Sequence, residues 1–169
     1  MNAIVYTSNT GTTKEYAKLL SDKLSLPYYS LDEIEYKVKP GSKIIYLGWI
    51  MAGRVKGYKK VVKDYDVRAV CAVGMGATGT QVKEVRTKNK IPSAIPVFTL
   101  QGGFDVKKLH GIYKIMITIM VKTAGKGLAN KQDRTQEEDQ MLEMMLHGGK
   151  YVDEKNLKAI LDWYGKRGE

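Results

Sequence analysis

The sequence predicts an α/β protein with a doubly wound, five-stranded parallel sheet. Short apolar segments alternate with segments of helical periodicity along most of the chain. The apolar segments are continuous and do not alternate with polar residues, which is typical of strands that helices cover on both faces. Alternating strands and helices of this kind form parallel sheets with crossover helices. We therefore expect a single domain over residues 1–169.

The predicted elements follow one another in a regular order. Strands are expected at Ala3–Tyr6, within Leu26–Leu31, and at Lys43–Trp49, Arg68–Met75 and Pro96–Gly102. Helices are expected at about Thr12–Leu24, Gly57–Tyr65, Thr80–Lys88 and Asp153–Lys166. The apolar face predicted for the last helix consists of Leu157, Ile160, Leu161 and Trp163.

Residues 107–152 form a longer segment than one crossover helix requires, and we expect them to be an insertion before the last helix. An apolar helical segment, Leu109–Gly125, is followed by the Met-rich "EEDQMLEMMLHGG". The apolar residues at helical spacing are Ile112, Ile115, Met116, Ile119 and Met120, and the flanking lysines are Lys107, Lys108, Lys114 and Lys122. Three roles stay open for this segment: packing on the core or on a second subunit, contact with a membrane surface, or lining an apolar substrate site.

The bulk composition is that of a soluble globular protein, with 43% hydrophobic and 27% charged residues. The lone Cys71 excludes an intramolecular disulfide, and its apolar neighbours predict a buried, unreactive thiol. A strand pattern begins almost at once, and no apolar run approaches about 18 residues. We expect a cytoplasmic protein, with peripheral contact at the inner membrane face as the one membrane option.

The chain is strongly basic, with a formal net charge of +10. The densest basic stretch contains Arg54, Lys56, Lys59, Lys60, Lys63 and Arg68. Such a surface favours acidic proteins, anionic lipids or carboxylate-rich ligands, and a solvated surface without a partner explains it equally well. Nothing nearby combines aromatic residues with base-reading side chains, so a nucleic-acid partner is not expected.

Ligands of open parallel sheets bind outside the carboxyl ends of the strands. The loops that leave the first, third, fourth and fifth strands read "TSNTGTT", "GWIMAGR", "GMGATGT" and "QGGFD". Their small residues let the backbone approach a ligand, and Trp49, Met51, Met75 and Phe104 are candidates to cover a flat one. No catalytic triad or carboxylate pair is readable, and neither His110 nor His147 has metal-ligand spacing. Catalytic side chains and a metal are therefore not expected, and redox chemistry would belong to a cofactor.

The first loop has the most specific pattern. Ser8–Thr13 precedes a helix whose free N–H groups and dipole favour an anion, and its hydroxyls supply further donors. The loop contains no lysine and no Gly-Lys-Ser/Thr, which excludes a Walker-type triphosphate loop. It also lacks Gly-x-Gly-x-x-Gly, which argues against a dinucleotide. A single terminal phosphate held by neutral donors fits better than an ordinary helix cap, which would explain one hydroxyl only.

The stretch "YTSNTGTTKEYA" resembles the signature of the flavodoxin family, with Tyr6, Ser8, Gly11, Thr13 and Ala17 at the family's spacing. The resemblance implies a flavodoxin-like sheet in the strand order 2-1-3-4-5 and FMN bound without covalent attachment. It places the phosphate in the first loop and the isoalloxazine ring between the loops after the third and fourth strands. The implied cofactor-binding residues are Ser8, Asn9, Thr10, Gly11, Thr12, Thr13, Trp49, Ile50, Met51, Ala52, Gly53, Met75, Gly76, Ala77, Thr78, Gly79, Gly103 and Phe104.

Two departures from typical flavodoxins keep the function open. Typical members are acidic, whereas this chain is basic, and typical short members lack a segment like 107–152. An apolar helix inserted at this place is similar, more loosely, to that of the menaquinone-dependent protoporphyrinogen dehydrogenases. The resemblances imply an electron-transfer protein that meets redox partner proteins, acidic ones given its charge. The alternative is an FMN-dependent dehydrogenase acting on a porphyrinogen or a quinone, and a flavin-free interaction protein is the third option. A less acidic site should also make reduction of the flavin easier than in typical flavodoxins.

Overall fold

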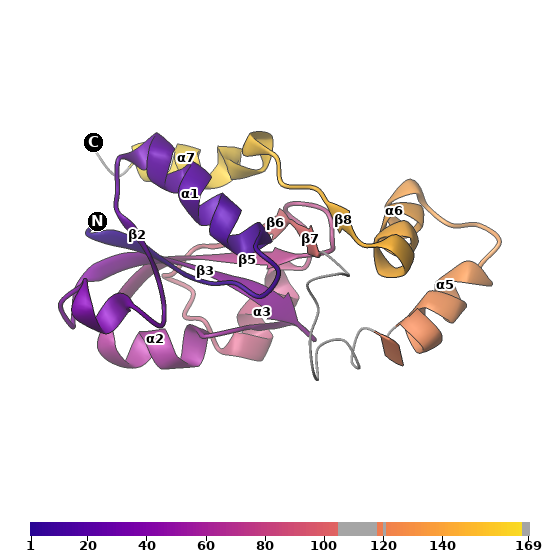
Figure 1. The fold of residues 1–169 in the computed structure, drawn as a ribbon, viewed down its shortest axis with the longest axis horizontal. Helices are drawn as coiled ribbons and strands as arrows, with labels where there is room; N and C mark the ends of the chain where they lie inside the picture. The colour runs from indigo at the N-terminus through magenta and orange to yellow at the C-terminus, as the bar shows by residue number, and fades with distance from the viewer. Residues whose placement is uncertain (105–117, 120, 167–169) are drawn as a thin grey trace.

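A computed structural model gives the chain as a three-layer α/β/α sandwich with a helical extension at one end (Figure 1). The structure describes residues 1–104, 118–119 and 121–166. Among these residues no helix is both long and apolar enough to cross a membrane.

Five parallel strands form the central sheet in the order β2-β1-β3-β5-β6. They are β1 (Ala3–Thr7), β2 (Tyr28–Ser30), β3 (Lys43–Met51), β5 (Asp66–Gly74) and β6 (Val97–Gln101). Counted along the chain this is the order 2-1-3-4-5, which confirms the predicted fold class. The order reverses between β1 and β3, and the loops that leave two such strands diverge and open a crevice for ligands.

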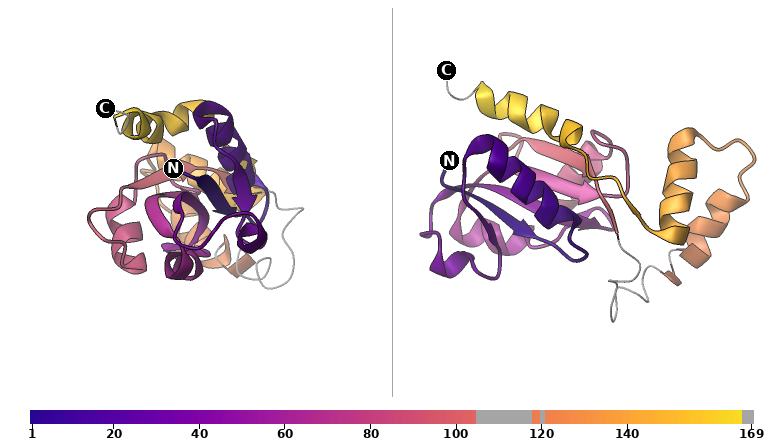
Figure 2. Two further views of the ribbon diagram at one scale, coloured as in Figure 1. Left: turned by 90° about the vertical axis from the view of Figure 1, so that its left-hand side faces the viewer. Right: turned by 45° about the horizontal axis from the view of Figure 1, so that its top comes forward.

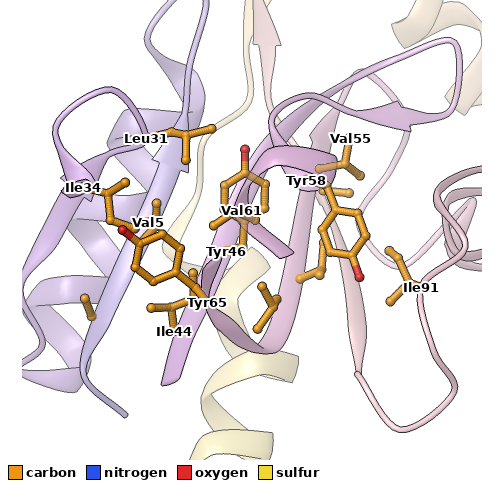
Figure 3. Close-up of a cluster of buried hydrophobic side chains, with 14 of the residues drawn as sticks. Val5, Leu31, Ile34, Ile44, Tyr46, Val55, Tyr58, Val61, Tyr65 and Ile91 are labelled. Atoms are coloured by element: carbon orange, nitrogen blue, oxygen red, sulfur yellow. The ribbon is translucent and has the colours of Figure 1, made fainter. Parts of the chain in front are cut away.

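Helices cover both faces of the sheet. One face carries α1 (Thr12–Leu24), η4 (Glu154–Leu157) and α7 (Lys158–Gly165). The other carries η1 (Ile34–Tyr36), α2 (Tyr58–Asp64) and α3 (Val82–Asn89). Successive residues of β3 serve the two cores in turn, because side chains alternate across a strand. Ile44 and Tyr46 pack under α2 and α3, whereas Ile45 and Leu47 pack under α1 and α7. Figure 3 shows Tyr46 in the first of these cores, between the rings of Tyr58 and Tyr65.

The third strand is longer than predicted. It was expected to end at Trp49, but β3 continues to Met51 because it pairs antiparallel with the short β4 (Arg54–Val55). Ala52 and Gly53 form the two-residue turn with φ of 50° and 75°. Such a double left-handed turn matches the twist of a hairpin. The predicted loop is therefore the end of a hairpin.

The inserted segment leaves and re-enters the sandwich through a two-stranded ladder. β7 (Gly103–Phe104) pairs antiparallel with β8 (Gly149–Lys150). A side chain at Gly103 would collide with the carbonyl of Gly149, so the ladder requires glycine there. Beyond it lie the π-helical η3 (Val121–Gly125), α5 (Lys126–Ala129) and α6 (Gln136–His147), which we call the appendage. The appendage stands beyond the edge of the sheet at which the parallel strands end (Figures 1 and 2).

The sequence predictions for the inserted segment are tested in part. The Met-rich stretch forms α6. The first part of the predicted apolar helix, with His110, Ile112, Ile115 and Met116, lies outside the described residues, as does Met120. Ile119 is described, and 55% of it is exposed. Leu157, the last residue of η4, and Ile160, in α7, are fully buried, as the apolar pattern predicts.

Candidate functional site

The carboxyl edge of the sheet brings the predicted loops together. Gly102 N–H, after β6, donates to the Gly74 carbonyl at the end of β5 (2.8 Å). Thr12, at the start of α1, donates its hydroxyl to the Gly103 carbonyl (3.3 Å). Loops that follow β1, β5 and β6 therefore meet at one end of the sandwich, on the side where the appendage lies (Figure 1).

The first loop is shaped by a left-handed glycine. Gly11, with φ of 106°, is the N-cap of α1 and supplies no side-chain cap. Its N–H donates to Ser8 Oγ (3.2 Å), so the Ser8 hydroxyl proton stays available to a ligand. The first N–H groups of a helix have no partner within the helix. The loop therefore offers uncapped amides, flanked by the exposed Asn9 and the half-buried Thr10.

Thr13 is the unusual residue of this loop. Its side chain is 1% exposed, and within the described part of the chain its Oγ1 has no hydrogen-bond partner. Buried polar groups in native proteins are normally paired, so an unpaired one calls for an explanation. Thr12 and Thr13 thus differ in role: the first hydroxyl already binds the backbone of β7, and the second is unused.

The predicted second segment, Trp49–Gly53, is fixed to α3 by hydrogen bonds. The buried Asn89 accepts a hydrogen bond from Val55 N–H (2.9 Å) and donates to the carbonyls of Gly53 (2.9 Å) and Val85 (2.7 Å). Lys88 donates to the Ala52 carbonyl (3.2 Å). The hairpin end is thereby fixed on α3, with Trp49, Ile50 and Met51 still in strand β3 and half-buried.

The predicted third segment, Met75–Gly79, is fixed to β6. Gly79 N–H donates to the Thr99 carbonyl (3.0 Å), and Thr78 Oγ1 accepts from Gln101 N–H (2.9 Å). The Ala77 carbonyl accepts from Thr80 Oγ1 (2.6 Å). Met75, Gly76 and Ala77 remain half-buried beside the end of β5, where the prediction places the ring. Gly103 and Phe104, predicted as loop residues, form β7.

Two residues at this edge escaped the sequence prediction. Lys56 holds its ammonium 5.6 Å from the centroid of the Trp49 ring, a cation–π arrangement. Tyr16 was expected only as a core residue. Its hydroxyl donates to the Gln101 carbonyl (2.5 Å) and accepts from Asn156 Nδ2 (2.6 Å), which ties α1 to the chain on both sides of the insertion. Burial raises the pKa of this phenol. A lysine within a basic stretch and a tyrosine within an apolar face carry no signal that marks them.

The sole cysteine of the sequence is not part of the candidate site. Cys71 is fully buried in β5, and burial raises the pKa of its thiol. A thiol that stays protonated is a poor nucleophile, which agrees with the predicted unreactive role.

Comparisons with known proteins identify one family for this chain. The model of a family described as "Flavodoxin domain" matches residues 3–130. A search of curated proteins found no significant match. One similar solved structure is named "Putative flavoprotein from Bacteroides uniformis"; it has 16% sequence identity and a TM-score of 0.41, and the match covers 69% of this chain and 97% of that chain. The family match spans the five parallel strands and the loop Ser8–Thr13, so the chain belongs to the flavodoxin domain family of flavoproteins.

Proposed function

We propose that this protein binds FMN at the carboxyl edge of the sheet and transfers electrons through it. The observation that carries the proposal is the buried Thr13 hydroxyl without a hydrogen-bond partner, at the uncapped start of α1. An anion bound there would accept from this hydroxyl and from the free helical amides, and the helix dipole would favour it. Leaving a buried hydroxyl unpaired costs about 1–3 kcal/mol, which a phosphate acceptor would relieve.

The donor set fits a monophosphate held by neutral groups. The residues that would hold the phosphate are Ser8, Asn9, Thr10, Gly11 and Thr13. Residues Trp49–Met51 and Met75–Ala77, which are half-buried at the ends of β3 and β5, would flank the ring. Bound FMN would supply the electron-accepting ring, and the protein would supply binding, orientation and electrostatics.

The test separates recognition of the phosphate from recognition of the ring. Apo-protein is titrated with FMN and with riboflavin, which lacks the phosphate, and binding is followed by quenching of flavin fluorescence. We expect FMN to bind much more tightly than riboflavin. Thr13→Val, which keeps the shape of the side chain, should weaken FMN binding about tenfold or more and leave riboflavin binding unchanged, because a hydrogen bond to a charged group is worth about 1.5–3 kcal/mol.

The same variant has a second readout in the apo-protein. Because Val removes an unpaired buried hydroxyl, Thr13→Val should raise the free energy of unfolding of the apo-protein by about 1 kcal/mol in urea denaturation. The matched control is Thr87→Val, whose exposed hydroxyl bonds the Lys83 carbonyl within α3 and should affect neither flavin. Equal affinities of the wild type for FMN and riboflavin would refute the phosphate site.

Acidic redox proteins are the proposed partners. Helices α2 and α3 carry six basic and two acidic residues, against four and three on α1 and α7. Complementary charge speeds the encounter of redox proteins and makes it sensitive to salt. The α2–α3 face is therefore the surface proposed to meet such a partner.

A dehydrogenase acting on a porphyrinogen or a quinone is the second candidate. One observation favours it: the appendage lies beyond the same edge of the sheet as the candidate flavin site (Figure 1). Anaerobic incubation of the FMN-loaded protein with protoporphyrinogen and a menaquinone analogue distinguishes the two functions. Turnover would establish the enzyme, and bound FMN without turnover favours the electron carrier.

A further inference from the structure

Lys56 contacts the end of strand β3, where Trp49 is one of the residues proposed to flank the flavin ring. Its N–H donates to the Trp49 carbonyl (3.0 Å), and its carbonyl accepts from the Tyr46 hydroxyl (2.5 Å). The ammonium lies over the Trp49 ring. The backbone of Lys56 is thus bonded to two residues of strand β3, Trp49 and Tyr46.

Further hydrogen bonds connect Lys56 to the start of the loop Ser8–Thr13, which is proposed to hold the phosphate. A phenol has one proton, and Tyr46 gives it to Lys56, so the Thr7 hydroxyl donates to Tyr46 (2.8 Å). Thr7 is the last residue of β1, directly before the loop. The packing is close, because a Cβ added to Gly57 would collide with the Tyr46 hydroxyl and lie 2.6 Å from Thr7 Oγ1. Lys56 is therefore two hydrogen bonds from the start of the loop.

The charge of Lys56 stands out against its surroundings. Residues 7–13 contain no ionisable side chain. Among the residues that the structure describes, no carboxylate forms an ion pair with Lys56. Lys56 is half-buried, and no acid in the described part of the chain offsets its charge. The effective dielectric there is lower than in bulk water, so the interaction energy of Lys56 with a nearby charge is larger than in water.

We propose that Lys56 stabilises the reduced, anionic form of the bound flavin and so raises its two-electron reduction potential. This inference rests on the proposed function. The oxidised ring is uncharged; it takes two electrons and one proton to give a hydroquinone with one negative charge, and an external reductant supplies the electrons. A cation beside the ring therefore favours the product over the reactant. Lys56 is a tuning residue: its ammonium makes no bond with the reacting atoms and transfers no proton.

The test compares potentials of FMN-loaded variants in a dithionite titration with a reference dye at low ionic strength. Lys56→Gln should make the reduced state about tenfold less favourable, which lowers the midpoint by about 30 mV for two electrons. Lys56→Arg keeps the charge and should keep the potential. Lys63→Gln removes the same charge from the exposed end of α2 and should have little effect. The difference between Lys56→Gln and wild type should shrink as salt is added, since ions screen the interaction.

The Lys56 variants should fold like the wild type, because the hydrogen bonds of Lys56 are made by its backbone N–H and carbonyl, which a side-chain substitution keeps. A readout without flavin checks the placement of the ammonium. In a Trp163→Phe background, Trp49 is the only tryptophan, and its fluorescence in the apo-protein should change in Lys56→Gln but not in Lys63→Gln.

The outcomes separate this inference from the proposed function. A wild type that binds no FMN would overturn both. Tight FMN binding with equal potentials in wild type and Lys56→Gln would overturn only the role of Lys56, as would an equal shift in Lys63→Gln. Loss of FMN from Lys56→Gln alone would also overturn it, because the ammonium would then hold the cofactor and not tune its reduction.

Discussion

Asn89 shows how one buried polar side chain fixes a predicted ligand-binding segment. Its amide is 7% exposed, pairs with three backbone groups, and joins the C-terminal end of α3 to the β3–β4 hairpin. A buried amide is stabilising only because each of its donors and acceptors is paired. The hairpin end that carries Ala52 and Gly53 is thus positioned by a residue more than 30 positions further along the chain.

Asn89→Ala should lower the free energy of unfolding by about 2–3 kcal/mol, because it leaves the Val55 N–H and the Gly53 carbonyl without their partner. Urea denaturation followed by circular dichroism measures the change. Asn2→Ala is the matched control: its exposed side chain accepts one bond, from Lys43 N–H, and should cost much less. A loss at Asn89 no larger than at Asn2 would show that the hairpin does not depend on this amide.

At the scale of elements, the α5–α6 pair is held by charged side chains. Arg134 donates to the carbonyls of Leu128 and Ala129 at the end of α5 and pairs with Asp139 (2.6 Å) in α6. Glu138 accepts from Thr135 N–H (2.9 Å), and Thr135 Oγ1 accepts from Glu138 N–H (3.2 Å), which is a capping box. Lys131 also bonds Glu138 (2.7 Å). The start of α6 therefore rests on a contact that depends on the charge of Glu138.

The Glu138 carboxyl should titrate below its ordinary pKa of 4.5, because the Lys131 ammonium and the Thr135 amide stabilise its charged form. A group with a lowered pKa in the folded state contributes stability above its ordinary pKa and loses it as the pH falls through the lowered value. NMR titration of the carboxyl carbons measures the shift. In Lys131→Gln the pKa of Glu138 should move back toward 4.5; an unchanged titration would show that the lysine contact does not persist in solution.

At the scale of the whole molecule, the long helices on the two faces of the sheet differ in charge. Helices α2 and α3 carry six basic and two acidic residues, whereas α1 and α7 carry four and three. Two exposed lysines of α2, Lys59 and Lys63, have matched counterparts in Lys14 and Lys18, exposed on α1. The two layers therefore allow the same change of net charge to be made on opposite faces.

The pair Lys59→Gln and Lys63→Gln should elute from a cation exchanger at lower salt than the pair Lys14→Gln and Lys18→Gln, although both lose two charges. Retention depends on the summed charge of the face that meets the exchanger, and α2 and α3 carry a larger excess of basic residues than α1 and α7. Elution at the same salt would show that net charge alone governs binding and would remove the support for a docking face there.

The amount that could be predicted differs between the sandwich and the site. The strands and the helix bounds of α1 follow from local apolar patterns, because buried parallel strands need continuous apolar residues. The strand order was expected only from the resemblance to the flavodoxin family, and the structure has that order. The extension of β3 into a hairpin, the ladder of β7 with β8 and the contact of Lys56 with Trp49 were not predicted. Each depends on pairing between residues that no local periodicity marks.

The sequence by itself determined the parallel sheet, the neutral hydroxyl-rich loop and the membership in a flavoprotein family, because these depend on local composition and spacing. Only the tertiary structure decided that Thr12 binds the backbone of β7 while the hydroxyl of Thr13 is left unpaired, and that Lys56 lies beside the end of β3. Adjacent threonines are equivalent in a sequence pattern. They become different when the fold provides an acceptor for one and buries the other without one.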